Sequence, residues 1–226
     1  MAKNSTYWDK KLPKNLEESS YTPWLNDKLC VLPPEGEIIL DLGCGNGEDT
    51  AWLIANGYKV ISLDFSEYAV DRVSKINKEN TFLFDMSNPE DWKVFEDNSF
   101  SAIVANLSLH YFDDATTKMI IGEIKRILKP KGKLIARVNS NADKEFGAGD
   151  GVQLEEGFFV NQERGITKRF FSLGSANLYF SKIGYAAVCP KEITYIGKPK
   201  KVIEIVAQKE MTKEHGVSQN QTQKGS

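Results

Sequence analysis

The sequence of 226 residues has few of the residues that build metal centres or disulfide frameworks. It contains three cysteines, far apart and without a CxxC pair, and two histidines. We therefore expect neither a disulfide scaffold nor a metal site. No charge of one sign dominates either, because 29 lysines and arginines stand against 31 aspartates and glutamates. This balance argues against a nucleic-acid binder held by global charge.

Long apolar runs are also missing. No stretch of about 18 apolar residues could span a membrane, and the N-terminus lacks the apolar segment of a signal peptide. We therefore expect a cytoplasmic protein that does not bind membranes. We also expect a monomer or homodimer. The hydrophobic fraction of 41% is enough for a core, and the length suits one large α/β domain better than two complete ones.

The order of patterns predicts three parts: an N-terminal arm (1–36), a main domain (37–208) and a disordered tail (209–226). Strand-like runs alternate with helical patterns in the main domain, which predicts βαβ units and a mainly parallel sheet. We expect strands at 37–42, 59–64, 81–84, 100–106 and 133–139, and helices at 48–56, 66–77, 115–128 and 172–183.

Two further features follow the fifth predicted strand. Residues 140–168 hold five glycines and no clear period, so we expect a long functional loop there. The runs 185–195 and 201–207 are separated by a turn signal at 197–200, which predicts an antiparallel hairpin.

A glycine-rich turn is the strongest local signal. It occupies residues 43–47, after the first predicted strand and before a helix. Its G-x-G-x-G register differs from the dinucleotide fingerprint, since Glu48 stands where the third glycine should be, and no Gly-Lys-Ser/Thr follows. The turn lets a polar ligand lie directly on the backbone.

Acidic residues end the next two strands. Asp64 would lie beside the glycine turn and suits a ribose diol, while Asp85 could accept a hydrogen bond from an adenine amino group. Phe65 and Met86 could enclose the ring. Each aspartate alone is more often a cap or turn residue, but three successive strand ends with such residues favour a nucleoside ligand.

With these residues, the sequence resembles the class I S-adenosylmethionine-dependent methyltransferases. The resemblance implies an α/β fold: a doubly wound, Rossmann-like, seven-stranded and mainly parallel sheet whose C-terminal antiparallel β-hairpin carries the one reversed strand. It implies S-adenosylmethionine as cofactor. The implied cofactor-binding residues are Asp41, Gly43, Cys44, Gly45, Asn46, Gly47, Asp64, Phe65, Asp85, Met86 and Asn106.

The stretch after the fourth strand faces the transferable methyl group in this family. Here Leu107-Ser108 replaces the Pro-Pro of the amino-methylating nucleic-acid enzymes, which disfavours that chemistry. His110 is a candidate base or substrate positioner, with a purely structural histidine as the alternative. Tyr111 is the second candidate for a catalytic role.

Acceptor binding is predicted for aromatic and basic residues outside this stretch. The arm could cover the site with Tyr7, Trp8 and Trp24, or simply pack against the core. Arg137 and Arg169 could clamp an anionic group of the acceptor, or could instead form internal ion pairs.

The resemblance favours methyl transfer to a small-molecule or ion acceptor. The compact size and the absence of an extended basic surface support this interpretation. Two alternatives remain open, a protein-lysine methyltransferase and a non-catalytic protein that binds S-adenosylmethionine or serves as a scaffold.

Overall fold

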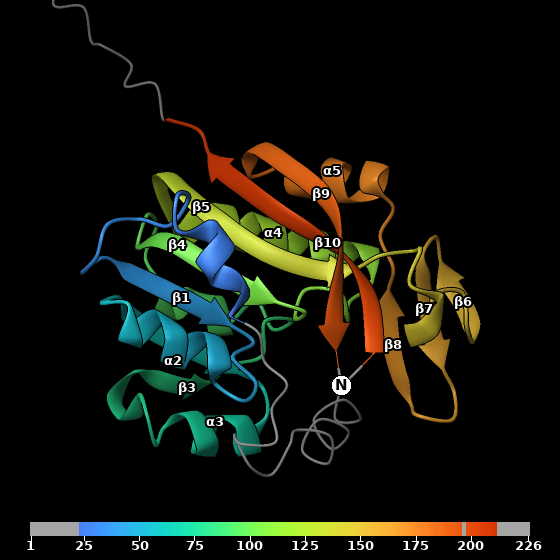
Figure 1. Cartoon of the computed structure of the whole chain (residues 1–226), viewed down its shortest axis with the longest axis horizontal. Coiled ribbons are helices and arrows are strands. Elements are labelled where there is room, and N and C mark those ends of the chain that lie inside the picture. The colour runs from blue at the N-terminus through green and yellow to red at the C-terminus, as the bar shows by residue number, and fades with distance from the viewer. Residues whose placement is uncertain (1–22, 196–197, 212–226) are drawn as a thin grey trace, which may run out of the picture.

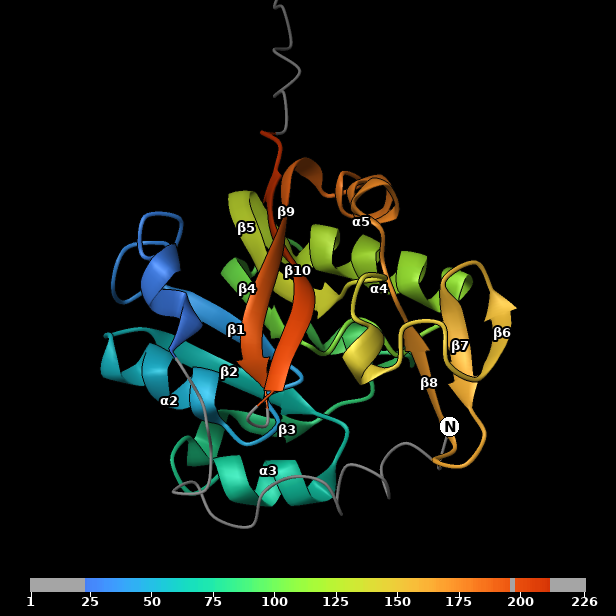
Figure 2. The same cartoon turned by 45° about the vertical axis from the view of Figure 1, so that its right-hand side comes forward.

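The computed structural model describes residues 23–195 and 198–211. These residues form a seven-stranded sheet with helices on both faces, and a separate three-stranded sheet beside it (Figure 1, Figure 2). In spatial order the main sheet contains β3 (Thr81–Leu83), β2 (Lys59–Asp64), β1 (Ile38–Leu42), β4 (Phe100–Asn106), β5 (Leu128–Asn139), β10 (Lys198–Lys209) and β9 (Gly184–Tyr195).

The strand directions match the predicted fold. The first five strands run parallel, and β10 is antiparallel to both β5 and β9. The strand order reverses at β1, which lies between β2 and β4. In open α/β sheets ligands bind at the carboxyl ends of the strands next to such a reversal.

Helices cover the two faces of this sheet unequally. On one face η2 and α2 enclose a cluster with Trp24, Leu53 and Ile135. On the other, α4 and α5 enclose the larger cluster around Ile124 and Phe180, as Figure 2 shows. The helical elements are η2 (Trp24–Lys28), α2 (Glu48–Ala55), α3 (Glu67–Val73), η3 (Lys78–Asn80), η4 (Asp91–Val94), α4 (Asp114–Ile127), η5 (Lys144–Phe146) and α5 (Leu173–Phe180).

Side-chain caps fix three of the helix starts. Ser66 accepts a hydrogen bond from the backbone N–H of Ala69, and Asp113 accepts one from that of Thr116. Ser172 forms a reciprocal capping box at the start of α5. Because each cap satisfies a backbone donor that the helix leaves free, these short polar residues set where the chain turns into the helix.

The structure corrects the expectation of a long loop over residues 140–168. Much of this segment forms the three-stranded antiparallel sheet of β6 (Val152–Glu155), β7 (Phe158–Asn161) and β8 (Ile166–Arg169). The strands are only four residues long and are separated by glycines with positive φ, which is too short for a period to emerge from the sequence.

Two other segments also differ from the predicted bounds. Lys129–Gly132, which separates the predicted helix 115–128 from the predicted strand 133–139, bulges out within β5, because Leu128 pairs with Phe100 and Lys133 with Ala102. The turn signal at 197–200 proves to be mostly strand, since β10 begins at Lys198, opposite Tyr195.

Candidate functional site

The glycine turn is tied to the end of β2 by its backbone. The N–H groups of Gly43 and Cys44 both donate to the carbonyl of Leu63, at 2.8 and 2.9 Å. The N–H of Gly45 donates to Oδ2 of Asp64 at 2.9 Å. The carboxylate of Asp64 is thereby held against the turn, which is the arrangement that the sequence predicted.

Two of the glycines leave no room for a side chain. Gly43 has φ +81°, and a Cβ there would lie 2.4 Å from Cβ of Ser108. Gly47 has φ +83°, and a Cβ there would lie 2.8 Å from Cγ2 of Val73. The turn therefore packs directly against the segment that follows β4, and an L-residue at either position is strained.

Buried carboxylates surround the turn. Asp41, Asp49 and Asp64 are all buried, and Thr50 donates to Asp41 at 2.6 Å. Burial, followed by the charge of Asp49, raises the pKa of Asp41 to about 8, with the Thr50 hydrogen bond acting in the opposite direction. Burial also raises the pKa of the Cys44 thiol. The charges of Asp49 and Asp64, which both act on Asp41, favour a positively charged ligand group in this region.

The end of β3 carries the next predicted pair. Oδ1 of Asp85 accepts from the N–H and the hydroxyl of Ser87, at 2.9 and 2.6 Å. Met86 is buried, its carbonyl accepts from the indole of Trp92, and its Cε would lie 3.6 Å from a Cβ at Gly43. Met86 thus borders the glycine turn, while Phe65 is half-buried.

Two asparagine oxygens near the turn are buried and unpartnered. They are Oδ1 of Asn46 and Oδ1 of Asn106, and neither has a hydrogen bond to the described part of the chain. The amide N–H of Asn106 donates to Asp49 at 2.9 Å, which fixes the orientation of that side chain. Buried acceptors of this kind are normally satisfied, so both positions fit a ligand that brings hydrogen-bond donors.

His110 lies on the segment that follows β4. It is 2% exposed, and burial, with the charges of Lys200 and Lys168, keeps its pKa well below the usual value. Its Nδ1 has no partner within the described residues. The ring of Tyr111 lies 4.4 Å from that of His110, centroid to centroid. A neutral imidazole with a free nitrogen can hold or accept a proton.

Trp24 and Arg137 are joined to each other. The guanidinium of Arg137 lies 4.3 Å from the Trp24 ring centroid and binds Glu204 at 2.6 Å in a buried ion pair. The Trp24 indole donates to Asp49 at 2.8 Å. Both residues therefore have internal partners, which is the alternative that the sequence left open. Their contacts with the acceptor stay a prediction.

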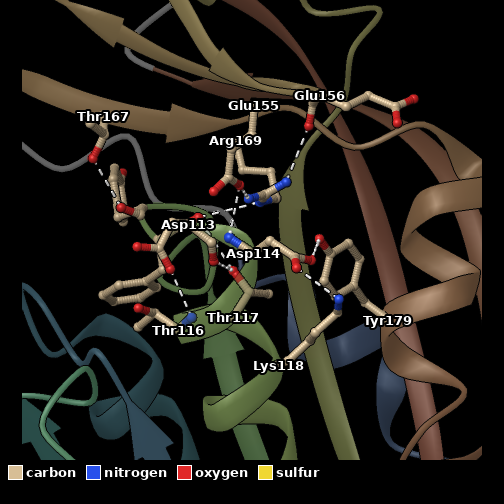
Figure 3. Close-up of polar contacts among 12 residues, drawn as sticks. Asp113, Asp114, Thr116, Thr117, Lys118, Glu155, Glu156, Thr167, Arg169 and Tyr179 are labelled. Carbon is tan, nitrogen blue, oxygen red and sulfur yellow. Dashed lines mark hydrogen bonds and ion pairs between the residues drawn. The ribbon is translucent and has the colours of Figure 1, made fainter.

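Arg169 likewise forms internal contacts, shown in Figure 3. Its guanidinium donates to Glu155 at 2.6 Å and to the carbonyls of Phe112 and Glu156. The same Glu155 oxygen accepts from the N–H of Asp114. These bonds join the small sheet to the start of α4. They occupy the guanidinium of Arg169, so its role as an anion clamp stays a prediction. Tyr7 and Trp8 lie outside the described residues.

Sequence reasoning missed two groups at this edge of the sheet. Asp49 binds both Trp24 and Asn106, and an acidic residue in the first turn after a glycine loop could have indicated it. Lys168 and Lys200 lie in the region read as loop and turn, where no pattern indicated them. Among the described residues no three His, Cys, Asp or Glu side chains gather as a metal site requires, and no described helix is long and apolar enough to cross a membrane.

Comparison with known proteins gives the same picture. The profile of a family described as a methyltransferase domain matches residues 40–136. Phosphoethanolamine N-methyltransferase 1 of Triticum aestivum is 35% identical over 115 residues, which is 48% of this chain and 23% of that protein. The 27-O-demethylrifamycin SV methyltransferase of Amycolatopsis mediterranei is 33% identical over 135 residues, 57% of this chain and 47% of that protein. The chain thus spans less than half the length of either relative.

A solved structure shows the same fold. A SAM-dependent methyltransferase from Methanosarcina mazei superimposes with a TM-score of 0.68 at 22% identity, covering 86% of this chain and 100% of that one. The glycine turn and the acidic strand ends fall within the matched residues 40–136. Residues 40–136 therefore match a methyltransferase domain, and the described chain has the fold of a SAM-dependent methyltransferase of known structure.

Proposed function

We propose that this protein transfers the methyl group of S-adenosylmethionine to a small-molecule acceptor. The observation that carries the proposal is the glycine turn held against Asp64 at 2.9 Å, with buried, unpartnered asparagine oxygens beside it. The small-molecule names of two relatives support the class of acceptor.

The residues at this edge fit the cofactor in chemistry and in space. The carboxylate of Asp64 accepts backbone N–H bonds from Gly45 and Ser66, and a carboxylate is an acceptor of the kind that ribose hydroxyls need. The Oδ1 atoms of Asn46 and Asn106 are free to accept bonds from an ammonium group. The buried charge of Asp49 favours the cationic end of the same ligand.

When bound, S-adenosylmethionine would supply an activated methyl group for attack by a lone pair of the acceptor. The chain needs mainly to align the acceptor and exclude water. His110 is neutral, and its Nδ1 has no partner among the described residues. Nδ1 can therefore accept a hydrogen bond from a protonated acceptor group, or accept the proton itself. Tyr111 packs against that ring and helps to fix its orientation.

Titration calorimetry with S-adenosylmethionine and S-adenosylhomocysteine tests the cofactor site. We expect micromolar binding to the wild type, and about tenfold to hundredfold weaker binding to Asp64→Ala, because its ligand hydrogen bonds are charge-assisted. Asp71→Ala is the matched control, since that carboxylate is 78% exposed in a surface ion pair. No binding at millimolar ligand, or equal binding to Asp64→Ala, contradicts the proposal.

The acceptor class needs a second experiment. The protein is incubated with tritiated cofactor and either a panel of small acceptors or a cell lysate. Labelled small molecules without a labelled protein band support the proposal. A labelled protein band favours the protein-lysine alternative, and cofactor binding without any transfer favours the non-catalytic one.

A further inference from the structure

Residues from four parts of the chain gather beside the acceptor side of the sheet. The N–H of Arg169 donates to the carbonyl of His110 at 2.7 Å, and the N–H of Phe171 donates to that of Asn139 at 2.9 Å. The segment that contains Lys168 therefore runs between the end of β4 and the end of β5. We call His110, Asn139, Asp143, Lys168 and Lys200 the lysine cluster.

Strand register sets the direction of both lysines. Successive side chains of a strand point to opposite faces. Arg169 points toward Glu155 and α5, as Figure 3 shows, so Lys168 leaves β8 on the other face. Val202 pairs with Asn139, and Lys200, two residues from Val202, lies on the same face of β10 as Val202 does.

The cluster holds more positive than negative charge. Lys200 is 4% exposed and donates to Oδ2 of Asp143 at 2.8 Å, and Oδ1 of Asp143 accepts from the N–H of Lys201. Lys168 is half-buried, and its ammonium group has no ion pair or hydrogen bond within the described residues. Burial, then the charges of Lys200 and Arg164, lower its pKa to about 8, against the opposing charge of Asp143.

Unpartnered polar atoms mark the same place. Asn139 is 1% exposed, and neither its Nδ2 nor its Oδ1 has a partner in the described part of the chain. Nδ1 of His110 is likewise free. These three atoms, without partners among the described residues, lie on segments that backbone bonds hold against the segment of Lys168. They fit a polar ligand better than a packed interior, because buried groups of this kind cost free energy when they are left unbonded.

The cluster is continuous with the cofactor site. Ser108, two residues before His110, donates to the carbonyl of Leu42 at 2.6 Å and packs on Gly43. A molecule in the cluster would therefore lie along the segment that borders the glycine turn.

We propose that the methyl acceptor carries an anionic oxygen group, a carboxylate or a phosphate, which binds Lys168 beside His110 and Asn139. That the bound molecule is the methyl acceptor rests on the proposed function, whereas the anion-binding site itself does not. Lysine provides the charge, and the free amide and imidazole groups provide hydrogen bonds to the remainder of the molecule.

The first experiment measures anion binding without any transfer. Protein with 13C-labelled lysine, loaded with S-adenosylhomocysteine, is titrated with base and the Cε resonance of Lys168 is followed, its assignment made with Lys168→Met. Inorganic phosphate and acetate, each at about 50 mM, are added in separate arms. We expect one or both to raise the measured pKa of Lys168 by at least about half a unit, because an adjacent anion favours the charged amine. The exposed Lys201 is the internal control.

The second experiment compares acceptors that differ only in the anionic group. The pairs are 3-mercaptopropionate with its amide, and phosphoethanolamine with ethanolamine. We expect the wild type to prefer the anionic member, Lys168→Met to lose about tenfold to hundredfold in kcat/KM for that member alone, and Lys168→Arg to recover part of it. Lys201→Met, one residue from Lys200 but exposed, should behave as wild type.

The outcomes separate the two proposals. A Lys168 pKa unchanged by phosphate and by acetate overturns the anion site, and so does an anionic preference that survives Lys168→Met. A shifted pKa without transfer to any acceptor leaves the anion site standing and counts against methyl transfer. If the wild type does not bind S-adenosylhomocysteine, the proposed function is contradicted and the anion site is not.

Discussion

The two halves of the sheet's carboxyl edge carry opposite charge. At the ends of β1 and β2, Asp41, Asp49 and Asp64 are buried around the glycine turn. Beside the ends of β5 and β8, two lysines lie near one carboxylate. Asp143 binds Lys200, and among the described residues it is the one carboxylate whose charge acts on Lys168. One half therefore suits a cationic group and the other an anionic group.

Arg137 forms the border between these halves. It binds Glu204 and stacks on Trp24, which in turn binds Asp49. Breaking this border is expected to have the largest effect, because removal of one partner leaves a buried charge unpaired. Arg137→Met should lower the free energy of unfolding by about 3–5 kcal/mol, measured by urea denaturation.

The control for that experiment is an exposed ion pair. Lys93 and Glu90 lie 2.7 Å apart but are 69% and 70% exposed. Lys93→Met should cost less than about 1 kcal/mol. Equal losses in the two variants would mean that the border is no more than a surface contact.

Gly43 tests the contact between the acidic half and the segment after β4. Gly43→Ala places a Cβ 2.4 Å from Ser108 in a backbone conformation with φ +81°. We expect a loss of about 1–3 kcal/mol in unfolding free energy and weaker binding of S-adenosylhomocysteine in calorimetry. Gly122→Ala, within α4 and with open space around it, should be neutral or stabilising by up to about 1 kcal/mol.

The acidic half could be predicted because its signals are local. The turn at 43–47 and Asp64 lie within one βαβ unit, and the strands 59–64 and 100–106 were predicted with the observed bounds. A glycine register and an acidic strand end each have a physical meaning that does not depend on distant residues. The overall sheet followed from the same alternation of runs.

The basic half could not be predicted because it is assembled by tertiary contacts. The segments of His110, Asn139 and Lys168 are brought together by backbone bonds to β8, a four-residue strand without a visible period, and to Phe171 just after it. The sequence also pointed to Arg137 and Arg169 as anion ligands, and the structure gives both internal partners. Which of several basic residues is left unpaired depends on the register of strands far apart in the chain.

His110 connects the two halves, so its replacement should separate binding from turnover. His110→Ala is expected to lower kcat by about tenfold to hundredfold and to leave the Kd of S-adenosylhomocysteine within about twofold, since the cofactor contacts lie at other residues. Single-turnover kinetics and calorimetry measure the two quantities. Unchanged turnover would make His110 a structural residue.

The acidic half and the border beside it should also differ in the sign of their pH dependence, the smallest effect considered. Burial raises the folded-state pKa of Asp41 to about 8 from 3.8, so its contribution to stability is present at acid pH and is lost as pH rises through about 4 to 8. For Glu204 burial acts upward, yet hydrogen bonds from Lys28 and Arg137 lower the pKa below its usual 4.5. Its contribution is therefore lost as pH falls through that lowered value.

Urea denaturation at several pH values between about 3 and 9 checks both signs. Asp41→Asn should gain stability relative to the wild type as pH rises, because the amide does not ionise. Glu204→Gln should lose most near neutral pH and approach the wild type in acid. Parallel pH profiles for the two variants would show that the two carboxylates lie in equivalent environments, which contradicts pKa shifts of opposite sign.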